Sequence, residues 1–517
     1  MKLAGVDRRV AVAVGVVLLA LAVAAVLLLG HGGATGVESL RSPSPTASEG
    51  LVTASPATSA SASVPPSPSP SPEPSPSAAV RPSSQPTPSR SSTARPGPSV
   101  APSSSGVAVV QGGLGFSYGP LQWSNPNQNG CGTNGDGEPA VHVNHAGFLF
   151  LGSEEGLGAG SDGWAQNPTT GGPGANACNP IYVGQPNPVP VANGGGDIDL
   201  AWGSATLGNG NYPLYVASLN GGSITVSVSR DNGHTFTSNS AQSGLPGDDR
   251  EWIAANGSGM SLLSFHDPNG DIEILRATSF GGGYASPKGA LQLTYAYQGN
   301  NEIGNIAIDH GDGTAYQAFV GNANLDEVGV SVSTDGGVNW SPRMVPCSVN
   351  RASLDHQFPN VSVAPDHHVW MSWSDDAAVY TAMSTDQGNS WTCFSGRVST
   401  TTARAIMPWM VAGAGGVDLV YYGTTDQNTW YVYFQQFVGS WRAPSQLMPV
   451  HQGPVCELGA TCTGSGNRQL YDDFGVDVDP QGYAHIAYSH DSPDLGGANT
   501  YTGYAVQTGG QTIGGPN

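Results

Sequence analysis

The chain has 517 residues, of which 11% are charged, and it carries a formal net charge of −21. Residues 1–105 hold seven basic and four acidic side chains, net +3, so the remaining residues 106–517 carry −24. A field of that sign repels nucleic acid and anionic membrane surfaces, which excludes both as partners of residues 106–517.

Residues 10–29 form an uncharged apolar run of about the length that a bilayer requires. Basic side chains at Lys2, Arg8 and Arg9 precede it, which keeps the N-terminus in the cytoplasm. We therefore predict that residues 1–30 are a cytoplasmic stub and a signal-anchor helix, which tethers a single-pass protein with its C-terminal part outside the cell. The alternative is a signal peptide that is cleaved to release a secreted protein.

Residues 31–105 consist mainly of Pro, Ser, Thr and Ala, as in "SVPPSPSPSPEPSPSAAV". Such a segment has too little apolar surface to fold, so we predict a disordered linker. In a polyproline-like state it would reach on the order of 200 Å. Residues 106–517 are then the single folded domain.

The cysteines all lie in the folded domain, at positions 131, 178, 347, 393, 456 and 462. An even number in an extracytoplasmic chain favours disulfides, and proximity in the sequence suggests the pairs 131–178, 347–393 and 456–462. No C-x-x-C or H-E-x-x-H pattern occurs, so we predict no metal site and no cofactor.

The folded domain is filled with short alternating runs such as "SITVSVSR" and "VGVSVSTD", bounded by Gly, Asn, Asp and Pro, which predict β-strands and tight turns. The pattern Ser-x-Asp-x-Gly-x-x-aromatic occurs three times, at 229–236, 333–340 and 384–391. Its aspartates, Asp231, Asp335 and Asp386, are spaced by about one or two periods of 52 residues. A worn copy, "RATSFGGGYAS", lies at the missing step.

A second marker repeats with nearly the same period, because each unit opens with a polar stretch that leads into a strand. The openings are at Glu138, Asp197, Asp249, Asn301, Asp355, Pro408 and Asp472. Units of this size predict an all-β propeller of four-stranded blades, with seven blades preferred and six as the alternative. The last unit is short, so we expect a strand near "GVAVVQGG" (residues 106–113) to complete its sheet.

The three intact repeats resemble the Asp-box, or BNR, repeat of the sialidase-like β-propellers. This resemblance implies that the box is the turn between the third and fourth strands of a blade, on the face away from the catalytic pocket. It also implies a pocket where arginines from several blades hold a substrate carboxylate and a tyrosine with a glutamate acts in catalysis. The chemistry of the motif agrees with a structural turn, since a short carboxylate accepts backbone N–H bonds and glycine supplies positive φ.

The opposite face should collect the segments that lead into the first strands, which are unusually polar. The candidates for binding substrate there are Arg250, Arg351, Arg404, Arg468 and Trp409, and the candidates for catalysis are Asp249, Asp355, Asp472 and Tyr421. We expect Arg250, Arg404 and Arg468 to point into one cavity, because guanidinium groups pair with carboxylates in a bidentate manner. Alternatively, each arginine pairs with a nearby acid and fixes the start of a blade.

The sequence therefore predicts a membrane-tethered, extracytoplasmic propeller, monomeric, that binds glycan at its central mouth and hydrolyses it as a sialidase-like glycosidase. Because the F/Y-R-I-P motif of sialidases is absent, a non-catalytic cell-surface propeller that recognises a protein or cell-wall ligand stays open as the alternative.

Overall fold

The computed structural model describes residues from 106 to 516, apart from several gaps. These gaps are residues 110–112, 123–130, 133, 156–159, 167, 169–170, 187–195, 220–223, 242–247, 349–353, 355–357, 395, 457–469 and 492–499. The predicted anchor (residues 10–29) and linker lie outside the described residues. Within the described part of the chain, no helix is long and apolar enough to cross a membrane.

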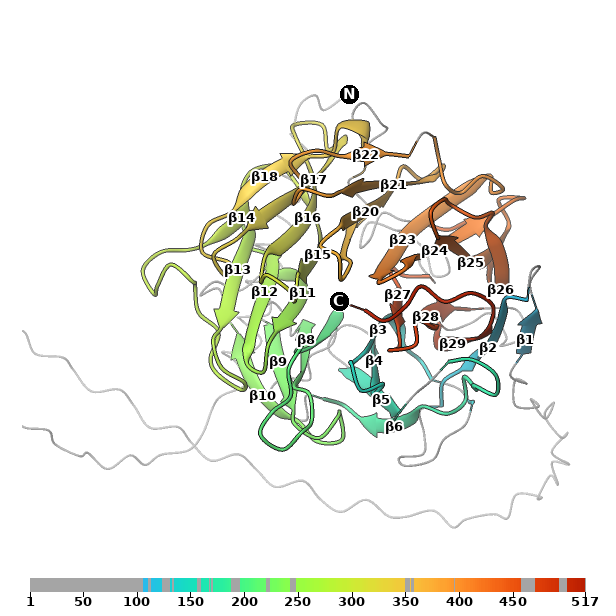
Figure 1. Ribbon diagram of the computed structural model, residues 1–517, viewed down its shortest axis with the longest axis horizontal. Coiled ribbons are helices and arrows are strands. Elements are labelled where there is room, and N and C mark those ends of the chain that lie inside the picture. Colours follow the sequence, from blue (N-terminus) through green and yellow to red (C-terminus); the bar gives the residue numbers. More distant parts are fainter. Residues whose placement is uncertain are drawn as a thin grey trace, which may run out of the picture. The chain divides into compact units, whose positions relative to one another are not determined.

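The strands form seven antiparallel sheets arranged as a ring around a central axis (Figure 1), which confirms the seven-bladed prediction. Blade 1 consists of β3 (Gly137–Val143), β4 (Leu149–Glu154), β5 (Ser161–Gln166) and β6 (Ile181–Gly184). Blade 2 consists of β7 (Ile198–Trp202), β8 (Leu214–Leu219), β9 (Ile224–Ser229) and β10 (Thr237–Ala241). Blade 3 consists of β11 (Asp249–Asn256), β12 (Met260–His266), β13 (Ile272–Ala277) and β14 (Tyr295–Tyr297).

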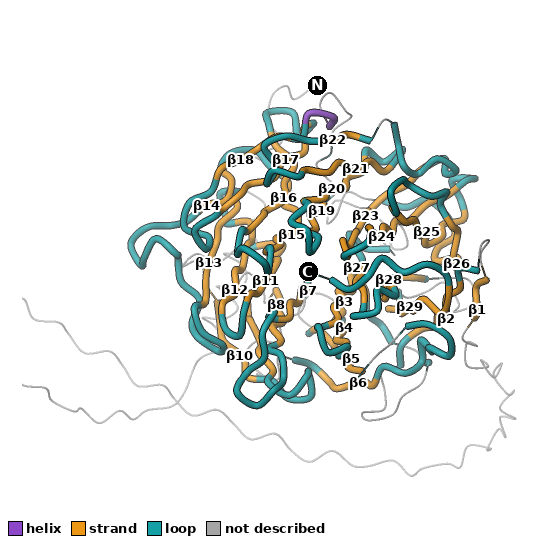
Figure 2. The backbone as a smooth tube through the Cα atoms, in the orientation of Figure 1, coloured by secondary structure: helices purple, strands orange, loops and turns teal. Residues whose placement is uncertain are grey.

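Blade 4 consists of β15 (Glu302–Ile308), β16 (Ala315–Gly321), β17 (Glu327–Ser333) and β18 (Ser341–Met344), followed by the 3-10 helix η1 (Pro346–Ser348). Blade 5 consists of β19 (Asn360–Val363), β20 (Val369–Ser374), β21 (Val379–Ser384) and β22 (Thr392–Cys393). Blade 6 consists of β23 (Arg404–Gly413), β24 (Gly416–Thr424), β25 (Thr429–Phe437) and β26 (Ser445–Gln452). The first strand of each blade is the one nearest the axis (Figure 2).

Blade 7 closes the ring with strands from both ends of the domain. It contains β27 (Gly475–Val478), β28 (Ala484–His490) and β29 (Tyr501–Gly509), completed by β2 (Gly115–Pro120) and β1 (Gly106–Val109). The expected N-terminal strand is thus present, but β2 rather than residues 106–113 pairs with β29, and β1 adds a fifth, outermost strand. The register from Gly115↔Gly509 to Pro120↔Gly503 ties the two ends of the domain together.

The ring has two faces, which we name by the direction of the first strands. The upper face is where β3, β7, β11, β15, β19, β23 and β27 begin, and the lower face is where they end. Because successive strands are antiparallel, the connections between second and third strands also lie on the upper face. The connections between third and fourth strands lie on the lower face.

The hydrophobic core lies between adjacent blades, since both faces of each sheet are covered. Val328, Val330 and Val332 of β17 belong to a cluster with residues of blade 5, whereas the alternate positions of the same strand carry Gly and Ser. Large residues on one side and small ones on the other allow neighbouring sheets to approach closely. This alternation explains runs such as "VGVSVS" in the sequence.

Polar side chains on the first strands join neighbouring blades near the axis. Asp199 of blade 2 accepts a hydrogen bond from the backbone N–H of Ile253 in blade 3, at 2.8 Å. Asp477 of blade 7 likewise accepts from Val143 of blade 1, at 2.8 Å. Side-chain oxygens placed this way satisfy backbone donors that the sheets leave unpaired, so they stabilise the ring.

The three Ser-x-Asp turns, which we call the Asp turns (229–236, 333–340 and 384–391), join third and fourth strands on the lower face, as predicted. In the third turn, Ser384 Oγ accepts the N–H of Gly388 at 2.7 Å and donates to Asp386 Oδ1 at 2.8 Å. Asp386 in turn accepts the N–H of Ser390 at 2.8 Å. The glycines of the three turns have φ of +87°, +86° and +82°, which favours glycine over any other residue.

Two predicted disulfides are present. The bond between Cys131 and Cys178 joins the connection before β3 to the connection before β6. The bond between Cys347 and Cys393 joins blade 4 to blade 5. The third predicted pair includes Cys462, which lies outside the described residues.

Candidate functional site

Carboxyl groups gather on the upper face around one arginine. Arg250 Nη1 lies 3.3 Å from Glu138 Oε2 and 3.2 Å from Asp197 Oδ2, and Arg250 Nη2 lies 2.6 Å from Asp473 Oδ2. The acids come from blades 1, 2 and 7 and the arginine from blade 3. We call the acids that interact with Arg250, together with two acids next to them, the carboxyl cluster. The acids that interact with Arg250 are Glu138, Asp197, Asp249, Glu251, Asp472 and Asp473. Glu154 adjoins Glu138, and Asp136 adjoins Glu154.

Bulges at the starts of two first strands aim the central pair of side chains. The register of β3 shifts between Gly137 and Ala140, and that of β11 shifts between Asp249 and Trp252. Glu138 and Arg250 sit in these bulges with φ of 47° and 53°. A bulge changes the direction in which the side chains of the bulged residues point. Both side chains therefore depart from the regular alternation of their strands.

Three of the acids are close enough to hold one cation together. Oxygens of Glu138, Glu154 and Asp197 all lie within 4.8 Å of one another, and such a group could hold a divalent cation. Burial of Glu138, together with the charges of Asp197 and Glu154, raises its pKa well above the usual range despite the nearby Arg250. Glu138 Oε1 also accepts the backbone N–H of Asp472 at 3.0 Å, which fixes the start of blade 7 against blade 1.

Two further acids in the cluster are buried without a hydrogen-bond partner for the carboxyl oxygens among the described residues. They are Asp136 and Glu251, whose exposed fractions are 0% and 1%. Burial, reinforced by Asp162 and Glu155, raises the pKa of Asp136 to about 9. Burial and the charge of Asp197 raise the pKa of Glu251 well above its usual range. With a pKa of about 9, Asp136 is a neutral acid at neutral pH.

Asp249 is the member of the cluster that faces solvent most openly. Protein atoms crowd its carboxyl group, and the resulting loss of hydration raises its pKa to about 6, with a further contribution from Asp197 that exceeds the opposing effect of Arg250. Its one hydrogen bond from a described residue is from the backbone N–H of Arg250, at 3.1 Å. A solvent-facing carboxyl group with such a pKa can give or take a proton near neutral pH.

Arg250 pairs with acids at the starts of other blades, and it is not open to bind a substrate carboxylate. Its side chain is 7% exposed, paired with three carboxylates, and its guanidinium carbon lies 4.8 Å from the Trp252 ring and 4.2 Å from the Phe358 ring. A guanidinium enclosed in this way has no open edge for the carboxylate of a sugar. The ion pairs of Arg250 are of the kind that the alternative from the sequence describes, in which an arginine pairs with acids at the start of a blade.

Arg404 has a different environment from Arg250. Its Nη2 lies 3.6 Å from Asp376 Oδ2, and its guanidinium carbon lies 5.3 Å from the Trp430 ring. The side chain is 29% exposed, so it remains reachable from solvent. Three other predicted site residues, Arg351, Asp355 and Arg468, lie outside the described residues, so the expected convergence of Arg250, Arg404 and Arg468 stays a prediction.

Two aromatic candidates occupy packing positions. Tyr421 is fully buried and stacks on Tyr433 with ring centroids 5.4 Å apart, which does not suit a nucleophile that must meet a substrate. Its neighbour Tyr422 points the other way, donating to the carbonyl of Ser489 at 3.3 Å. Trp409 is 8% exposed and stacks on Trp252 at 5.2 Å, so Trp252 covers one face of its ring. We therefore leave Tyr421 and Trp409 out of the site.

Several cluster members are not among the residues that the sequence suggested. Glu154 ends β4 and lies on the upper face because second strands end there. Glu251 lies near the start of the first strand β11, and Asp136 directly precedes the first strand β3. The sequence does indicate these acids in the segments "NGDGEP" and "GSEEG", because both open ends of one predicted hairpin contain acidic residues. Following the direction of each strand would have brought them to the same face as Asp249.

A cavity of about 170 Å³ lies along the axis below the cluster. Its lining comes from the first strands of several blades and their lower ends, with His142, His145, His310 and Pro516 among the residues. The polar groups of this cavity include the blade-joining Asp199 and Asp477. This cavity therefore lies toward the side of the Asp turns and not at the predicted mouth.

No protein-family model matches the chain, and no curated protein matches it significantly. A GH74 xyloglucanase from Xanthomonas campestris is similar at 13% identity and a TM-score of 0.41, over 75% of this chain and 55% of its own. A mutant of the NanB sialidase from Streptococcus pneumoniae is similar at 10% identity and a TM-score of 0.38, over 75% of this chain and 70% of its own.

The SapL1 lectin, solved in complex with alpha methyl fucoside, is similar at 12% identity and a TM-score of 0.38, over 74% of this chain and 97% of its own. The chain thus spans about half the length of the xyloglucanase. The topology of the seven sheets, which does not depend on these comparisons, defines a β-propeller.

Proposed function

We propose that this protein is an extracytoplasmic Asp-box propeller that binds glycan at the upper face and hydrolyses it with carboxyl groups of the cluster. The observation that carries the proposal is Asp249, a solvent-facing carboxyl group whose pKa of about 6 suits proton transfer. The hydrogen-bonded Asp turns support the Asp-box assignment. The two disulfides support an oxidising compartment.

Glycoside hydrolysis needs an acid and a second carboxylate. In the proposed reaction, Asp249 gives its proton to the glycosidic oxygen as the bond to the anomeric carbon breaks. Asp472, which is partly exposed at the start of blade 7, takes a proton from the water that attacks that carbon. Glu251 and Glu138 lie behind them, and burial raises the pKa of both carboxyl groups.

The charge of the cluster favours a neutral glycan over a sialoside. Arg250 is enclosed by three carboxylates, so it offers little to an anionic sugar. Carboxylates at a mouth repel an anionic substrate, whereas they accept hydrogen bonds from the hydroxyl groups of a neutral one. This narrows the sialidase-like prediction to a glycosidase of neutral substrates.

The test is hydrolysis of a panel of fluorogenic neutral glycosides and one sialoside by the full chain. We expect turnover of at least one neutral glycoside, with a rate that falls as pH rises through about 6, because the protonated Asp249 is the donor. Asp249→Asn and Asp472→Asn should each lower kcat by about 100-fold or more. Asp366→Asn, an exposed acid on the lower face, is the control and should leave the rate unchanged.

The mutual pairing of Arg250, Glu138, Asp197 and Asp473 favours a second candidate, a non-catalytic propeller that recognises a cell-surface ligand. An absence of turnover on the whole panel, with binding to immobilised glycans that Asp249→Asn weakens, would select this candidate. Absence of both turnover and binding would contradict the glycan proposal.

We also propose that residues 10–29 anchor the protein as a monomer in the cell membrane, with the propeller outside. The full chain should then remain in the membrane fraction after alkaline washing and appear in detergent as a single copy. A variant without residues 1–30 should be soluble, and a full chain recovered in the medium would instead indicate cleavage.

A further inference from the structure

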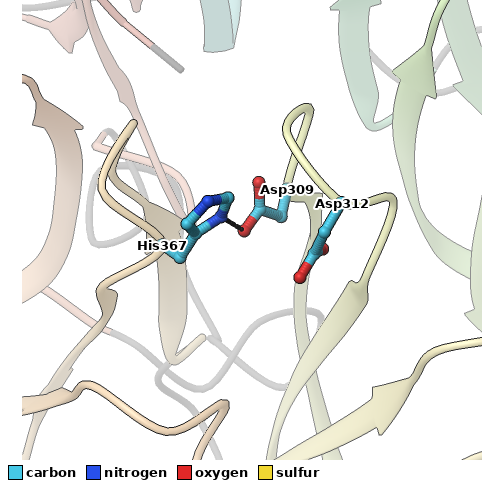
Figure 3. Close-up of side chains that lie close together, drawn as sticks. All are labelled: Asp309, Asp312 and His367. Atoms are coloured by element: carbon cyan, nitrogen blue, oxygen red, sulfur yellow. Dashed lines mark hydrogen bonds and ion pairs between the residues drawn. The ribbon is translucent and has the colours of Figure 1, made fainter.

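A second group of ligand-type side chains lies on the lower face, between blades 4 and 5. Asp309 and Asp312 belong to the connection between β15 and β16, and His367 belongs to the connection between β19 and β20 (Figure 3). His367 Nδ1 lies 2.6 Å from Asp309 Oδ2. One ligand atom from each of the three residues lies within 4.8 Å of the others.

His367 occupies a backbone position that blades 1 and 7 give to glycine. In blades 1 and 7 the same short turn is closed by Gly147, whose N–H donates to Asn144 at 2.8 Å, and by Gly482, whose N–H donates to Asp479 at 2.7 Å. In blade 5 the N–H of His367 donates to Ala364 at 2.9 Å.

The φ angles at these positions are 84° for Gly147, 80° for Gly482 and 67° for His367. A left-handed conformation is unfavourable for histidine and free for glycine. The sequence therefore has a histidine at a position whose backbone conformation favours glycine.

The two aspartates are held in place before any ligand arrives. The side chain of Asp309 is 0% exposed, and its Oδ1 accepts the N–H of Gly311 at 2.8 Å, which turns Oδ2 toward His367. Asp312 Oδ1 accepts the N–H of Thr314 at 2.8 Å. Gln387, from the Asp turn of blade 5, reaches Asp312 Oδ2 at 3.3 Å. Bonds to the outer oxygens of this kind orient carboxylates around a metal.

We propose that Asp309, Asp312 and His367 bind a divalent transition-metal ion of the Zn²⁺ class. One nitrogen and two carboxylate oxygens are the donors of a three-ligand zinc site with an open fourth position, whereas calcium prefers oxygen alone. Ligand atoms about 2.0 Å from a tetrahedral zinc lie about 3.3 Å apart, so the Asp309–His367 pair must open slightly as the ion enters. His367 has the freedom to do so, since its side chain is 54% exposed.

An ion at this position would link blades 4 and 5. Blades 4 and 5 are already joined by the disulfide between Cys347 and Cys393. An ion held by Asp309 and His367 would join the same two blades a second time, near the axial cavity that His310 lines. The open fourth position faces solvent and could accept a water molecule.

The test is titration of the chelator-treated full chain with Co²⁺, followed by visible absorption, and then displacement by Zn²⁺. We expect one ion per chain and a visible spectrum that Zn²⁺ removes. His367→Gly restores the residue that the equivalent turns use, so it should fold normally, yet it should weaken binding by about tenfold or more. Asp312→Asn should weaken binding to a similar extent.

The matched control is His368→Ala, which removes the adjacent histidine, paired with Asp366 at 3.0 Å, and should leave the affinity unchanged. A chain that binds no Co²⁺ would overturn the proposal and leave His367 and Asp309 as an ion pair. Binding that survives both His367→Gly and Asp312→Asn would also overturn it, because the ion would then sit elsewhere, such as at Glu138.

Discussion

The Asp turns of the lower face and the carboxyl cluster of the upper face place the same kind of side chain in opposite environments. In the Asp turns, hydrogen bonds from the side chain and backbone of Ser390 hold the pKa of Asp386 below its usual value. In the carboxyl cluster, burial raises the pKa of Asp136 to about 9 and that of Asp473 to about 7.

The difference shows that the number of donors around a carboxylate decides its charge in this ring. Where a carboxylate receives several N–H and O–H bonds it is a stable anion that shapes a turn. Where acids are buried together with one arginine, their pKa values rise and they bind protons near neutral pH. The following predictions test this contrast, beginning with the largest expected effect.

Arg250→Ala should cost the most, because it removes the buried cation that neutralises Glu138, Asp197 and Asp473. We expect the free energy of unfolding to fall by about 3–5 kcal/mol at neutral pH, measured by urea denaturation. The loss should shrink at pH 5, because Asp473, whose pKa is about 7, is protonated there and no longer needs the cation. Arg404→Ala, which removes a partly exposed arginine, is the control and should cost about 1 kcal/mol or less. Equal losses for both arginines would contradict the picture of a buried cluster.

Asp473 should make the protein less stable as pH rises. Its pKa is about 7 in the folded state and near 4 in the unfolded chain, so the folded state binds more protons between these values. Stability from this group is therefore complete below pH 4 and is lost as pH rises toward 7. In Asp473→Asn, the loss of unfolding free energy between pH 4 and pH 7 should be smaller by roughly 1–3 kcal/mol, as measured by thermal unfolding across pH. An unchanged slope would show that Asp473 is already ionised.

Gly337→Ala should be costly because the turn leaves no room for a side chain. Gly337 has φ of +86°, and an added Cβ would meet Leu262 at 2.8 Å. We expect a loss of about 2–3 kcal/mol, from the backbone and the contact together. Gly439→Ala is the matched control, since Gly439 has φ of +72° but no atom within 4 Å of its Cβ position. It should lose only the backbone part, about 1–2 kcal/mol, and identical losses would exclude the contact with Leu262.

Asp386→Asn should have the smallest effect and the opposite pH dependence. The pKa of Asp386 is lowered by its hydrogen bonds, so its contribution is present above the unfolded pKa and lost as pH falls. The variant should therefore be slightly less stable than the parent at pH 7 and more nearly equal to it in strong acid. A thermal melt at pH 7 and at pH 3 measures the difference, and a larger deficit in acid would contradict the assignment.

The repeat spacing predicted the ring because each blade must bury both faces of its sheet and therefore reuses one pattern. It placed the Asp turns correctly, together with the pairs Cys131–Cys178 and Cys347–Cys393. The starts of the first strands were also close, with β11 beginning at the predicted Asp249. These features depend on local sequence and strand direction alone.

The candidate site was only partly predictable, because it depends on which side of a strand each residue faces. Tyr421 and Tyr422 are adjacent, yet one packs on Tyr433 and the other reaches Ser489 in blade 7. A shift of one residue in the alignment of a strand moves every side chain to the other face of the sheet. The bulges at Arg250 and Glu138 add a residue and so change this alternation again. Whether an arginine is open or enclosed depends on acids from distant blades, which no local pattern reveals.

The closure of blade 7 has a mechanical consequence. A pull on the chain ahead of Gly106 is transmitted to β1, which is bonded only to β2 at the outer edge of the sheet. The first strand can peel away one pair at a time at low force, while β2 remains bonded to β29 on its other side. The ring would then withstand a pull on the preceding chain by losing only β1, and it would open only when the pairing of β2 with β29 breaks.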